Sequence, residues 1–271
     1  MAVQRAPVSG RLSDDRFDAT HETFERSSSQ QQLVLKTLKE LINTHEASSG
    51  ALRILSVGCG SGILDNQLIS ALASSAGTFE YTGVDPNPVA CHRFREEFKN
   101  LALENVKLNV KTETVESLNI NEPFDIIQLT HALYYFKDPA DTLEKLRGLL
   151  ALGGKLIIVH APNECLNRLS ECLWSHHAEQ DIWFSESLAE HLVKQDIKFT
   201  SHRIHGEVDV TQCFEDGCPH GENLLDFITQ SNCRESGGEV QARCLHLLKK
   251  FCRVDGESLK IEHPADVFVV M

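Results

Sequence analysis

Short apolar runs alternate with segments of helical periodicity through the central part of the chain. Each run is nearly continuous, which is typical of a strand buried on both faces of a parallel sheet. The helical segments between the runs are long enough to connect parallel strands. The pattern predicts an α/β, doubly wound fold, with strands within the runs 52–58, 79–85, 106–111, 124–136 and 153–161 and helices at 63–74, 88–101 and 139–152.

The flanking segments are less regular. Residues 1–14 are polar and contain Pro7 and Gly10, so we expect a frayed tail. Apolar residues recur at helical spacing from Arg16 to Asn43, and the serines at 27–29 divide this stretch into two helices, the second capped by a serine. Further along we expect helices at 163–180 and 185–194, the latter capped by Ser185, a strand at 199–210, a mainly helical stretch at 211–256 and a closing strand at 266–271.

A glycine-rich loop, Gly58-Cys59-Gly60-Ser61-Gly62, follows the first strand and precedes a helix. Glycines permit a tight turn there and close approach of the backbone to a ligand. By itself the loop fits three interpretations: a plain turn, a dinucleotide site and an S-adenosylmethionine site.

The second strand ends in Asp85-Pro86-Asn87-Pro88. A carboxylate at this edge of the sheet can accept hydrogen bonds from ribose hydroxyls. The alternative is a structural role at the start of the next helix, where Asp and Asn are favoured just before proline. Asn87 can fill that capping role, which would leave Asp85 for a ligand.

The loop lacks one glycine of the dinucleotide fingerprint, because Ile63 stands where the third glycine is expected. A pyrophosphate needs the close approach that this glycine allows. The loop instead resembles motif I of the class I S-adenosylmethionine-dependent methyltransferases. Three later segments resemble the same family in the same order: Thr112–Glu116, Phe124–Thr130 and Leu149–Val159.

This resemblance implies a Rossmann-like, mostly parallel seven-stranded sheet that binds S-adenosyl-L-methionine, with a smaller, mainly helical substrate-binding subdomain. The implied organisation is a flexible tail at 1–14, an N-terminal helical lid at 15–45, a cofactor-binding core at 46–161 and a substrate subdomain with the final core strands at 162–271. The implied cofactor-binding residues are Gly58, Cys59, Gly60, Gly62, Asp85, Pro86, Thr114 and Thr130.

Within that superfamily the chain is similar to the histamine N-methyltransferase family from Phe17 to Met271. The similarity rests on ILSVGCGSGILDNQLIS, LENVKL, HALYYFKDPADTLEKLRGLL, DVTQCFEDG and NLLDFITQS, and a generic methyltransferase would not share the last two. It implies N-methylation of a small imidazole-containing or related amine acceptor held under aromatic side chains. The implied acceptor-binding residues are Phe17, Phe24, Gln30, Tyr134, Tyr135, Trp174, Trp183 and Phe227.

Core packing is the alternative role for any single aromatic residue here, and Phe24 and Phe227 fit it as well as they fit a binding site. Tyr134 and Tyr135 are adjacent, just beyond a buried strand. Successive side chains of a strand point to opposite faces, so the two tyrosines cannot both enter one core. We therefore expect at least one phenol to face the site.

Three positions depart from the family pattern. Gln30 stands where the family has a glutamate that pairs with the acceptor's ammonium group, and loss of that charge weakens binding of a cation by about 1–3 kcal/mol. His131 replaces a glutamine, and a family asparagine that contacts the acceptor falls near His263-Pro264. These changes leave the identity of the acceptor open.

His131 is the candidate catalytic residue. A neutral imidazole nitrogen of the acceptor needs no base before it attacks a methyl group, but a partner must fix the tautomer through the other ring nitrogen. His131 can accept that hydrogen bond or take up the proton afterwards. The alternative is a structural histidine at the end of a strand.

Charge and hydropathy narrow the partners. The formal net charge of −13 opposes binding to a phosphate backbone, so we expect a small-molecule acceptor and no nucleic acid. No apolar stretch reaches the roughly 18–20 residues that a bilayer span needs, and the first residues lack the apolar segment of a secretory signal. We expect a cytoplasmic monomer that binds no membrane.

The nine cysteines are irregularly spaced and support neither a disulfide framework nor a metal site. The nearest approach to a metal cluster is Cys213, Cys218 and His220, with His205 upstream, and it lacks paired CxxC spacing. We expect reduced thiols and no metal.

Two further functions stay open at this level. One is O-methylation, or methylation of a different amine, on the same fold. The other is a non-catalytic binding module, and the intact glycine loop together with Asp85 argues against it.

Overall fold

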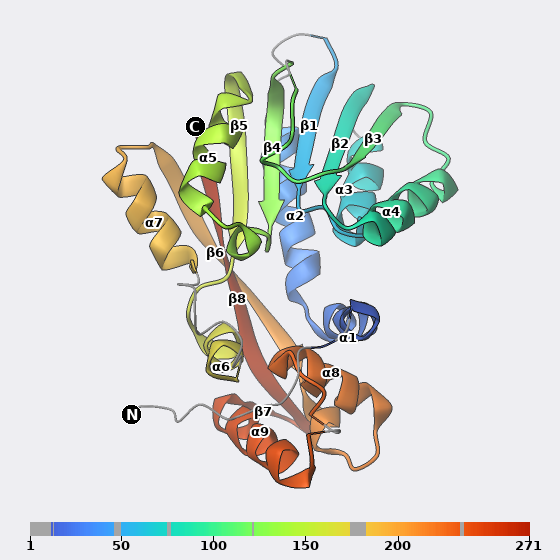
Figure 1. Cartoon of the computed structure of the whole chain (residues 1–271), viewed down its shortest axis with the longest axis vertical. Helices are drawn as coiled ribbons and strands as arrows, with labels where there is room; N and C mark the ends of the chain where they lie inside the picture. Colours follow the sequence, from blue (N-terminus) through green and yellow to red (C-terminus); the bar gives the residue numbers. More distant parts are fainter. Residues whose placement is uncertain are drawn as a thin grey trace. The chain divides into compact units, whose positions relative to one another are not determined.

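The computed structural model describes residues 12, 14–45, 50–74, 77–120, 122–173, 183–233 and 236–271. Its elements in chain order (Figure 1) are α1 (Asp14–Ser27), α2 (Gln30–Asn43), β1 (Leu52–Val57), α3 (Ile63–Ala73), β2 (Phe79–Asp85), α4 (Pro88–Asn100), β3 (Val106–Thr112), β4 (Phe124–Thr130), the 3-10 helix η1 (Leu133–Tyr135), α5 (Pro139–Gly148), β5 (Leu150–His160), α6 (Cys165–Leu173), α7 (Ser185–Lys194), β6 (Phe199–Asp209), the 3-10 helix η2 (Thr211–Phe214), α8 (Pro219–Thr229), α9 (Gly238–Phe251), β7 (Arg253–Asp255) and β8 (Ser258–Val270).

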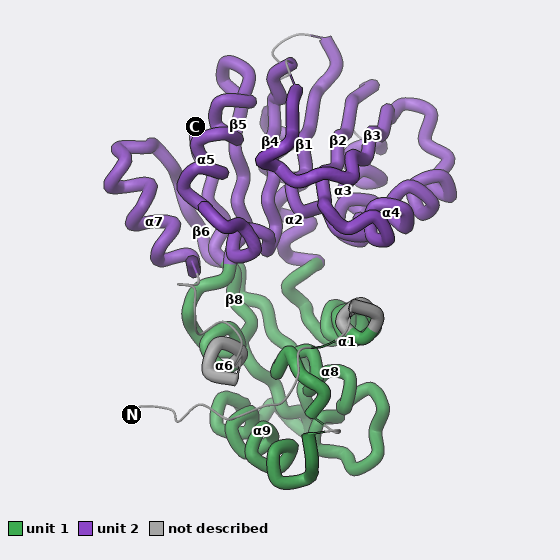
Figure 2. Tube along the Cα trace, in the orientation of Figure 1, with its two compact units in different colours: residues 1–31, 161–182, 204–265 green, residues 32–160, 183–203, 266–271 purple. Residues whose placement is uncertain are grey.

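The chain divides into two compact units, each assembled from separate stretches (Figure 2). Unit 1 comprises residues 1–31, 161–182 and 204–265. Unit 2 comprises residues 32–160, 183–203 and 266–271. The segment boundaries suggested by the sequence stay predictions.

The sheet has the strand order β3-β2-β1-β4-β5-β8-β6, with β7 pairing β8 at one side. β1 to β5 are parallel, and β8 runs antiparallel to β5, with Leu156 opposite Val270 and His160 opposite Asp266. The α/β fold with a mostly parallel sheet is therefore confirmed. The strand order reverses between β1 and β4, and open α/β sheets bind ligands outside the carboxyl ends of strands at such a point.

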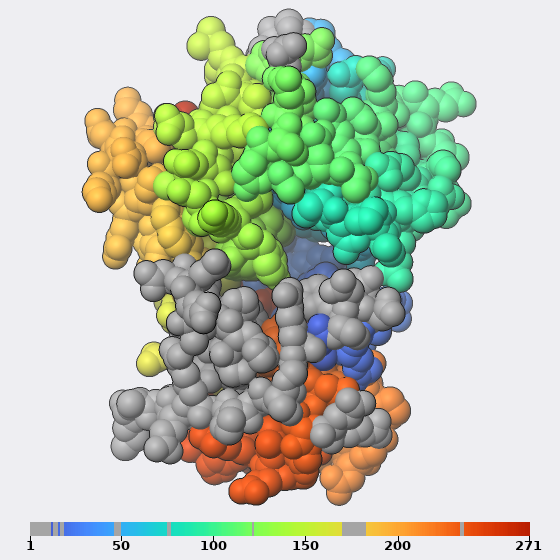
Figure 3. Space-filling view, viewed as in Figure 1, coloured from blue at the N-terminus to red at the C-terminus, as the bar shows by residue number. Residues whose placement is uncertain are grey.

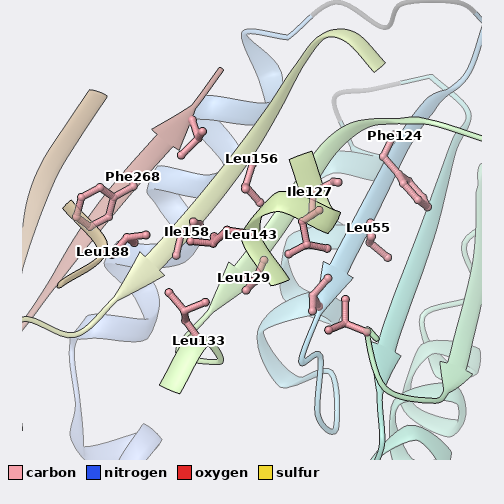
Figure 4. Packing of buried hydrophobic residues seen from close by; sticks show 14 of the residues in the cluster. Leu55, Phe124, Ile127, Leu129, Leu133, Leu143, Leu156, Ile158, Leu188 and Phe268 are labelled. Carbon is pink, nitrogen blue, oxygen red and sulfur yellow. The ribbon is translucent and has the colours of Figure 1, made fainter. Parts of the chain in front are cut away.

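The buried strands alternate their side chains between two apolar layers. On one face Leu156 and Ile158 of β5 pack with Leu143 of α5, Leu188 of α7 and Phe268 of β8 (Figure 4). α2 and α3 lie on the other face of the sheet (Figure 1). The space-filling view shows the teal to yellow-green side chains of unit 2 as a continuous surface on the face turned to the viewer (Figure 3). Both faces are covered, as the continuous apolar runs require.

Three predicted details are wrong. α5 ends at Gly148, not at 152, because β5 begins at Leu150 and pairs with Phe124. β8 begins at Ser258, not at 266, because a turn at Gly256 pairs it with β7. Phe184 occupies the N-cap of α7, and the Ser185 hydroxyl donates instead to Asp266 Oδ2 at 2.5 Å, since a carboxylate is the stronger acceptor.

Every helix that the structure describes is too short or too polar to cross a bilayer. Within the same described ranges, no three His, Cys, Asp or Glu side chains gather closely enough to hold a metal ion.

Candidate active site

The glycine loop between β1 and α3 is fixed by its backbone. Gly58, Gly60 and Gly62 all have positive φ, at 71°, 52° and 72°. The N–H groups of Gly58 and Cys59 donate to the Val84 carbonyl at 2.8 and 3.2 Å, which ties the loop to the end of β2. Side chains rarely adopt these φ values, so the loop depends on glycine at all three positions.

The three glycines differ in what surrounds them. A Cβ atom on Gly58 would lie 2.6 Å from Ala132 Cβ, and one on Gly62 would lie 2.2 Å from the ring of Phe94. A Cβ on Gly60 would meet nothing within 4 Å. Gly58 and Gly62 are therefore required for packing, whereas the space at Gly60 is open to a ligand.

Asp85 lies at the end of β2, beside the loop. Its Oδ2 accepts a hydrogen bond from the Gly60 N–H at 3.0 Å, and its Oδ1 accepts one from the Asn87 N–H at 2.8 Å. Asn87 is the N-cap of α4, where its side chain accepts from Val89 and Ala90. The capping role therefore falls to Asn87, and the Asp85 carboxylate is half-buried at the edge of the loop.

The other predicted cofactor residues have different surroundings. Pro86 is exposed directly after Asp85. Thr114 is exposed too, and its hydroxyl accepts from the Ser117 N–H within a turn. The Thr130 hydroxyl, at the end of β4, donates to Gln128 Oε1 at 2.9 Å.

Cys59 points its thiol away from the loop into the fold. Its side chain is buried, and a hydrogen bond with Cys91, together with burial, raises the pKa of the thiol. The residue therefore contributes its backbone to the loop and a neutral thiol to the packing beneath it.

A buried polar network lies beneath the loop, and the sequence analysis did not identify it. The Gln128 amide donates to Ser56 Oγ at 2.7 Å and to Asp65 Oδ1 at 3.1 Å, and the Tyr81 hydroxyl donates to the same Asp65 oxygen at 2.6 Å. Burial raises the pKa of both Asp65 and Tyr81. The available signal was a polar residue near the carboxyl end of each apolar run, Gln128 in FDIIQLT and Ser56 in LRILSV.

The chain leaves β4 through a strained residue. His131 has a φ of 51°, and its N–H donates to the Val159 carbonyl at 2.9 Å. Positive φ is uncommon for a residue with a side chain, and such strain gathers at functional sites. Leu133 enters the core, whereas Tyr134 is half-buried and Tyr135 is 69% exposed.

The Tyr134 ring connects several predicted site residues. It stacks on His131 at 6.4 Å between ring centroids and meets Tyr135 edge-on at 5.1 Å. Its other stacking neighbour, at 4.8 Å, is His160 at the end of β5, which the sequence analysis did not select. Two histidines therefore flank this tyrosine.

His160 is fully buried and held by one hydrogen bond. Its Nε2 lies 2.6 Å from the Trp183 carbonyl, which can only accept, so Nε2 carries the proton. Burial lowers the pKa of His160 to about 4. Trp183 packs its own half-buried ring against His191 of α7, at 5.2 Å. His160 is thus a neutral imidazole with a defined tautomer.

Unit 1 brings together another set of predicted residues. The buried Phe24 ring lies 4.5 Å from Phe227 and 5.0 Å from His263. The amide of the buried Gln30 donates to the His263 carbonyl at 2.7 Å. Gly206 lies against this pair, since a Cβ there would be 2.7 Å from Gln30 Cβ. The Phe17 side chain and Trp174 lie outside the described residues.

Replacing Gly62 by alanine tests the loop. The new methyl group would collide with the buried Phe94 ring at a positive φ, so we expect G62A to lose about 1–3 kcal/mol of unfolding free energy and at least tenfold in affinity for S-adenosylmethionine. Urea unfolding and calorimetric titration measure the two effects. G148A, where a Cβ meets nothing and φ is ordinary, is the control. Equal behaviour of the two variants would contradict the packing argument.

The buried His160 predicts how stability varies with pH. The folded pKa of about 4 lies below the ordinary 6.5, so the unfolded chain binds more protons between these values and stability falls as the pH drops from 6.5 towards 4. The His160 contribution at pH 5 is a loss of about 2 kcal/mol relative to pH 7. Between pH 7 and pH 5, H160Q, which keeps an amide donor, should lose about 2 kcal/mol less unfolding free energy than wild type. Urea unfolding at the two pH values measures the difference. The same loss in both proteins would show that His160 is not buried as a neutral group.

Comparisons with known proteins agree with this geometry. Residues 55–156 match the methyltransferase domain family. The chain is 28% identical to histamine N-methyltransferase A of Xenopus laevis over 242 residues, which cover 81% of this chain and 82% of that protein. It is also 28% identical to histamine N-methyltransferase of Rattus norvegicus over 224 residues, which cover 74% and 73%. The similarity extends well beyond the matched domain.

Solved structures show the same fold at low identity. The YcgJ protein of Bacillus subtilis superimposes with a TM-score of 0.57 at 17% identity, covering 87% of this chain and 97% of that one. The plantazolicin methyltransferase BpumL, solved with a triazolic analogue and SAH, gives a TM-score of 0.53 at 15% identity, with 95% and 91% covered.

The matched domain includes the end of β1, the glycine loop and Asp85, where the sequence predicts the cofactor-binding edge of the sheet. The strand order agrees with that prediction, and so do the hydrogen bonds that tie the loop to the Val84 carbonyl. The predicted class is therefore confirmed, and the chain is an S-adenosylmethionine-dependent methyltransferase with its methyltransferase domain at residues 55–156.

Proposed function

We propose that the enzyme transfers a methyl group from S-adenosylmethionine to a ring nitrogen of a small imidazole-containing amine. The observation that carries the proposal is the packing of the β4 exit on the glycine loop, where Ala132 allows no Cβ on Gly58. His131, the residue before Ala132, therefore lies beside the cofactor loop. Similarity to histamine N-methyltransferases along 81% of the chain supports an imidazole acceptor.

The residues of unit 2 fit the cofactor. Gly60 leaves open space above the loop, and Asp85 offers a half-buried carboxylate for the ribose hydroxyls. We assign the remaining contacts to Gly58, Gly62 and the Pro86, Thr114 and Thr130 positions, with Cys59 contributing backbone. When bound, the cofactor supplies an electrophilic methyl group on sulfur, which an acceptor lone pair about 3–3.5 Å away can attack in line.

The part of this chain in the reaction is chiefly positioning. An imidazole attacks with the lone pair of its unprotonated nitrogen, so its N–H nitrogen must be held by an acceptor atom. We assign that role to His131. Tyr134 forms the adjacent wall and is itself held by stacking on His160, whose ring is locked through the Trp183 carbonyl. The positive φ of His131 costs backbone energy. We propose that this conformation orients the side chain towards the acceptor.

In unit 1, Phe24, Phe227 and Gln30 stay predicted acceptor-binding residues. The Gln30 amide donates to the His263 carbonyl, so a glutamate in the same conformation would set two oxygens 2.7 Å apart. Burial lowers the pKa of His263 to about 3 and keeps it uncharged. Glutamine at position 30 therefore fits the neighbouring carbonyl, where a glutamate would be repelled. Its side chain contributes hydrogen bonds but no charge. The cytoplasmic location and the monomeric state stay predictions.

A screen with methyl-labelled S-adenosylmethionine tests the acceptor class. Purified enzyme is incubated with histamine, carnosine, histidine, other aromatic amines, a catechol and a phenol, and the label on each acceptor is counted. We expect ring N-methylation of at least one imidazole, because His131 can hold the N–H group of a neutral imidazole ring. Label confined to the catechol or phenol would replace the proposal with O-methylation on the same fold.

Substitution of His131 tests its role. H131A should lower kcat on the true acceptor by a factor of about 10²–10³, because the partner that fixes the acceptor's tautomer is removed. The Kd of S-adenosylmethionine should change less than twofold, since the loop glycines and Asp85 are intact. Steady-state kinetics and calorimetry separate the two quantities. Unchanged turnover would assign His131 a purely structural role.

A further inference from the structure

Two buried cysteines of unit 1 lie with their sulfur atoms close together. Cys233 follows α8, and Cys244 lies on α9, eleven positions further along the chain. Their Sγ atoms are 3.8 Å apart, and the residues are 1% and 0% exposed. Both cysteines are free thiols. The fold therefore pairs two thiols that the irregular spacing of cysteines in the sequence does not indicate.

The two thiols have different surroundings. Thr229 Oγ1 lies 3.1 Å from Cys233 Sγ, and Ser231 Oγ lies 3.6 Å from the same sulfur. Cys244 packs among apolar side chains such as Leu248, one turn later on α9. Hydrogen bonds from the Cys244 thiol and from the two hydroxyls lower the pKa of Cys233, whereas contact with Cys233 raises the pKa of Cys244. Because the thiolate is the reactive form of cysteine, Cys233 is the nucleophile of the pair.

The backbone of Cys233 is held in place. Its N–H donates to Oδ1 of the buried Asp226 at 2.9 Å, and Asp226 Oδ2 pairs with Arg16 of α1 at 2.6 Å. A disulfide has an S–S distance of about 2.05 Å, so the two sulfur atoms must approach by about 1.8 Å. Rotation of a cysteine side chain between staggered rotamers moves its sulfur further than that. Closure of a disulfide is therefore within reach of side-chain rotation.

We propose that Cys233 and Cys244 are a peroxide-sensitive pair that closes to a disulfide between α9 and the segment after α8. The Cys233 thiolate attacks hydrogen peroxide, so that the O–O bond breaks, an S–O bond forms and the leaving hydroxide takes up the thiol proton as water. The Cys244 sulfur then attacks Cys233 Sγ, so that the S–O bond breaks, the S–S bond forms and a second water leaves with the Cys244 proton. Two thiols are oxidised, and one peroxide is reduced to two waters. A peroxide is small enough to reach a buried thiol through local opening of the chain.

Peptide mapping of the full-length protein tests the pair. Reduced wild-type protein is treated with hydrogen peroxide, then denatured in the presence of an alkylating reagent and digested without reductant. We expect a peptide pair joined through Cys233 and Cys244, two hydrogens lighter than the sum of the free-thiol peptides, and its loss after treatment with dithiothreitol. C213S, which removes another buried thiol of unit 1, is the control and should form the same link. Unlinked Cys233 and Cys244 in the treated wild type, or links mainly to other cysteines, would overturn the inference.

Trapping the oxidised intermediate assigns the two roles. In C244S the oxidised Cys233 has lost the thiol that would displace its oxygen, so dimedone, which adds to sulfenic acids, should label it. In C233S the label on Cys244 should be about tenfold lower, because its surroundings favour the neutral thiol. Circular dichroism reports on the folding of each variant, and the wild-type mapping depends on neither of them. Equal labelling of the two cysteines would overturn the assignment of Cys233 as the nucleophile.

Discussion

The hydrogen bonds between the glycine loop and the end of β2 set the geometry on which the rest of unit 2 depends. The Val84 carbonyl accepts from two loop N–H groups, and Asp85 accepts from the Gly60 N–H. Because β1 and β2 are parallel neighbours, the loop and the carboxylate end at the same edge of the sheet. Their separation is fixed before a ligand binds, which reduces the ordering that binding must supply. The residues that follow β4 are positioned by the same loop, because Ala132 packs against Gly58.

Burial decides the charge state of the groups around this frame. The Asp65 carboxyl, the Tyr81 phenol and the Gln128 amide satisfy one another beneath the loop, so their polar atoms are buried with partners. Burial lowers the pKa of His160, so its ring is neutral. Its fixed tautomer holds the ring in place, and Tyr134 stacks on it. A rigid supporting layer is what positioning catalysis needs, because small displacements of an acceptor cost large factors in rate.

In unit 1, the side chain at position 30 fits the buried groups around it. The Gln30 amide donates to a backbone carbonyl where a carboxylate would be repelled, and Gly206 leaves the room that this contact requires. An acceptor preference therefore depends on the whole set of buried partners.

The sequence by itself determined the alternation of strands and helices, the glycine loop, Asp85 and the capping role open to Asn87, because periodicity and turn chemistry are properties of neighbouring residues. It also placed Tyr134 and Tyr135 beyond a buried strand. Only the tertiary structure decided that the Gln128 amide donates to Asp65 and that Tyr134 stacks on His160. The same holds for Gln30, whose amide donates to a carbonyl 233 residues away. Contacts between distant segments depend on strand register and on how helices pack, and a local pattern carries neither.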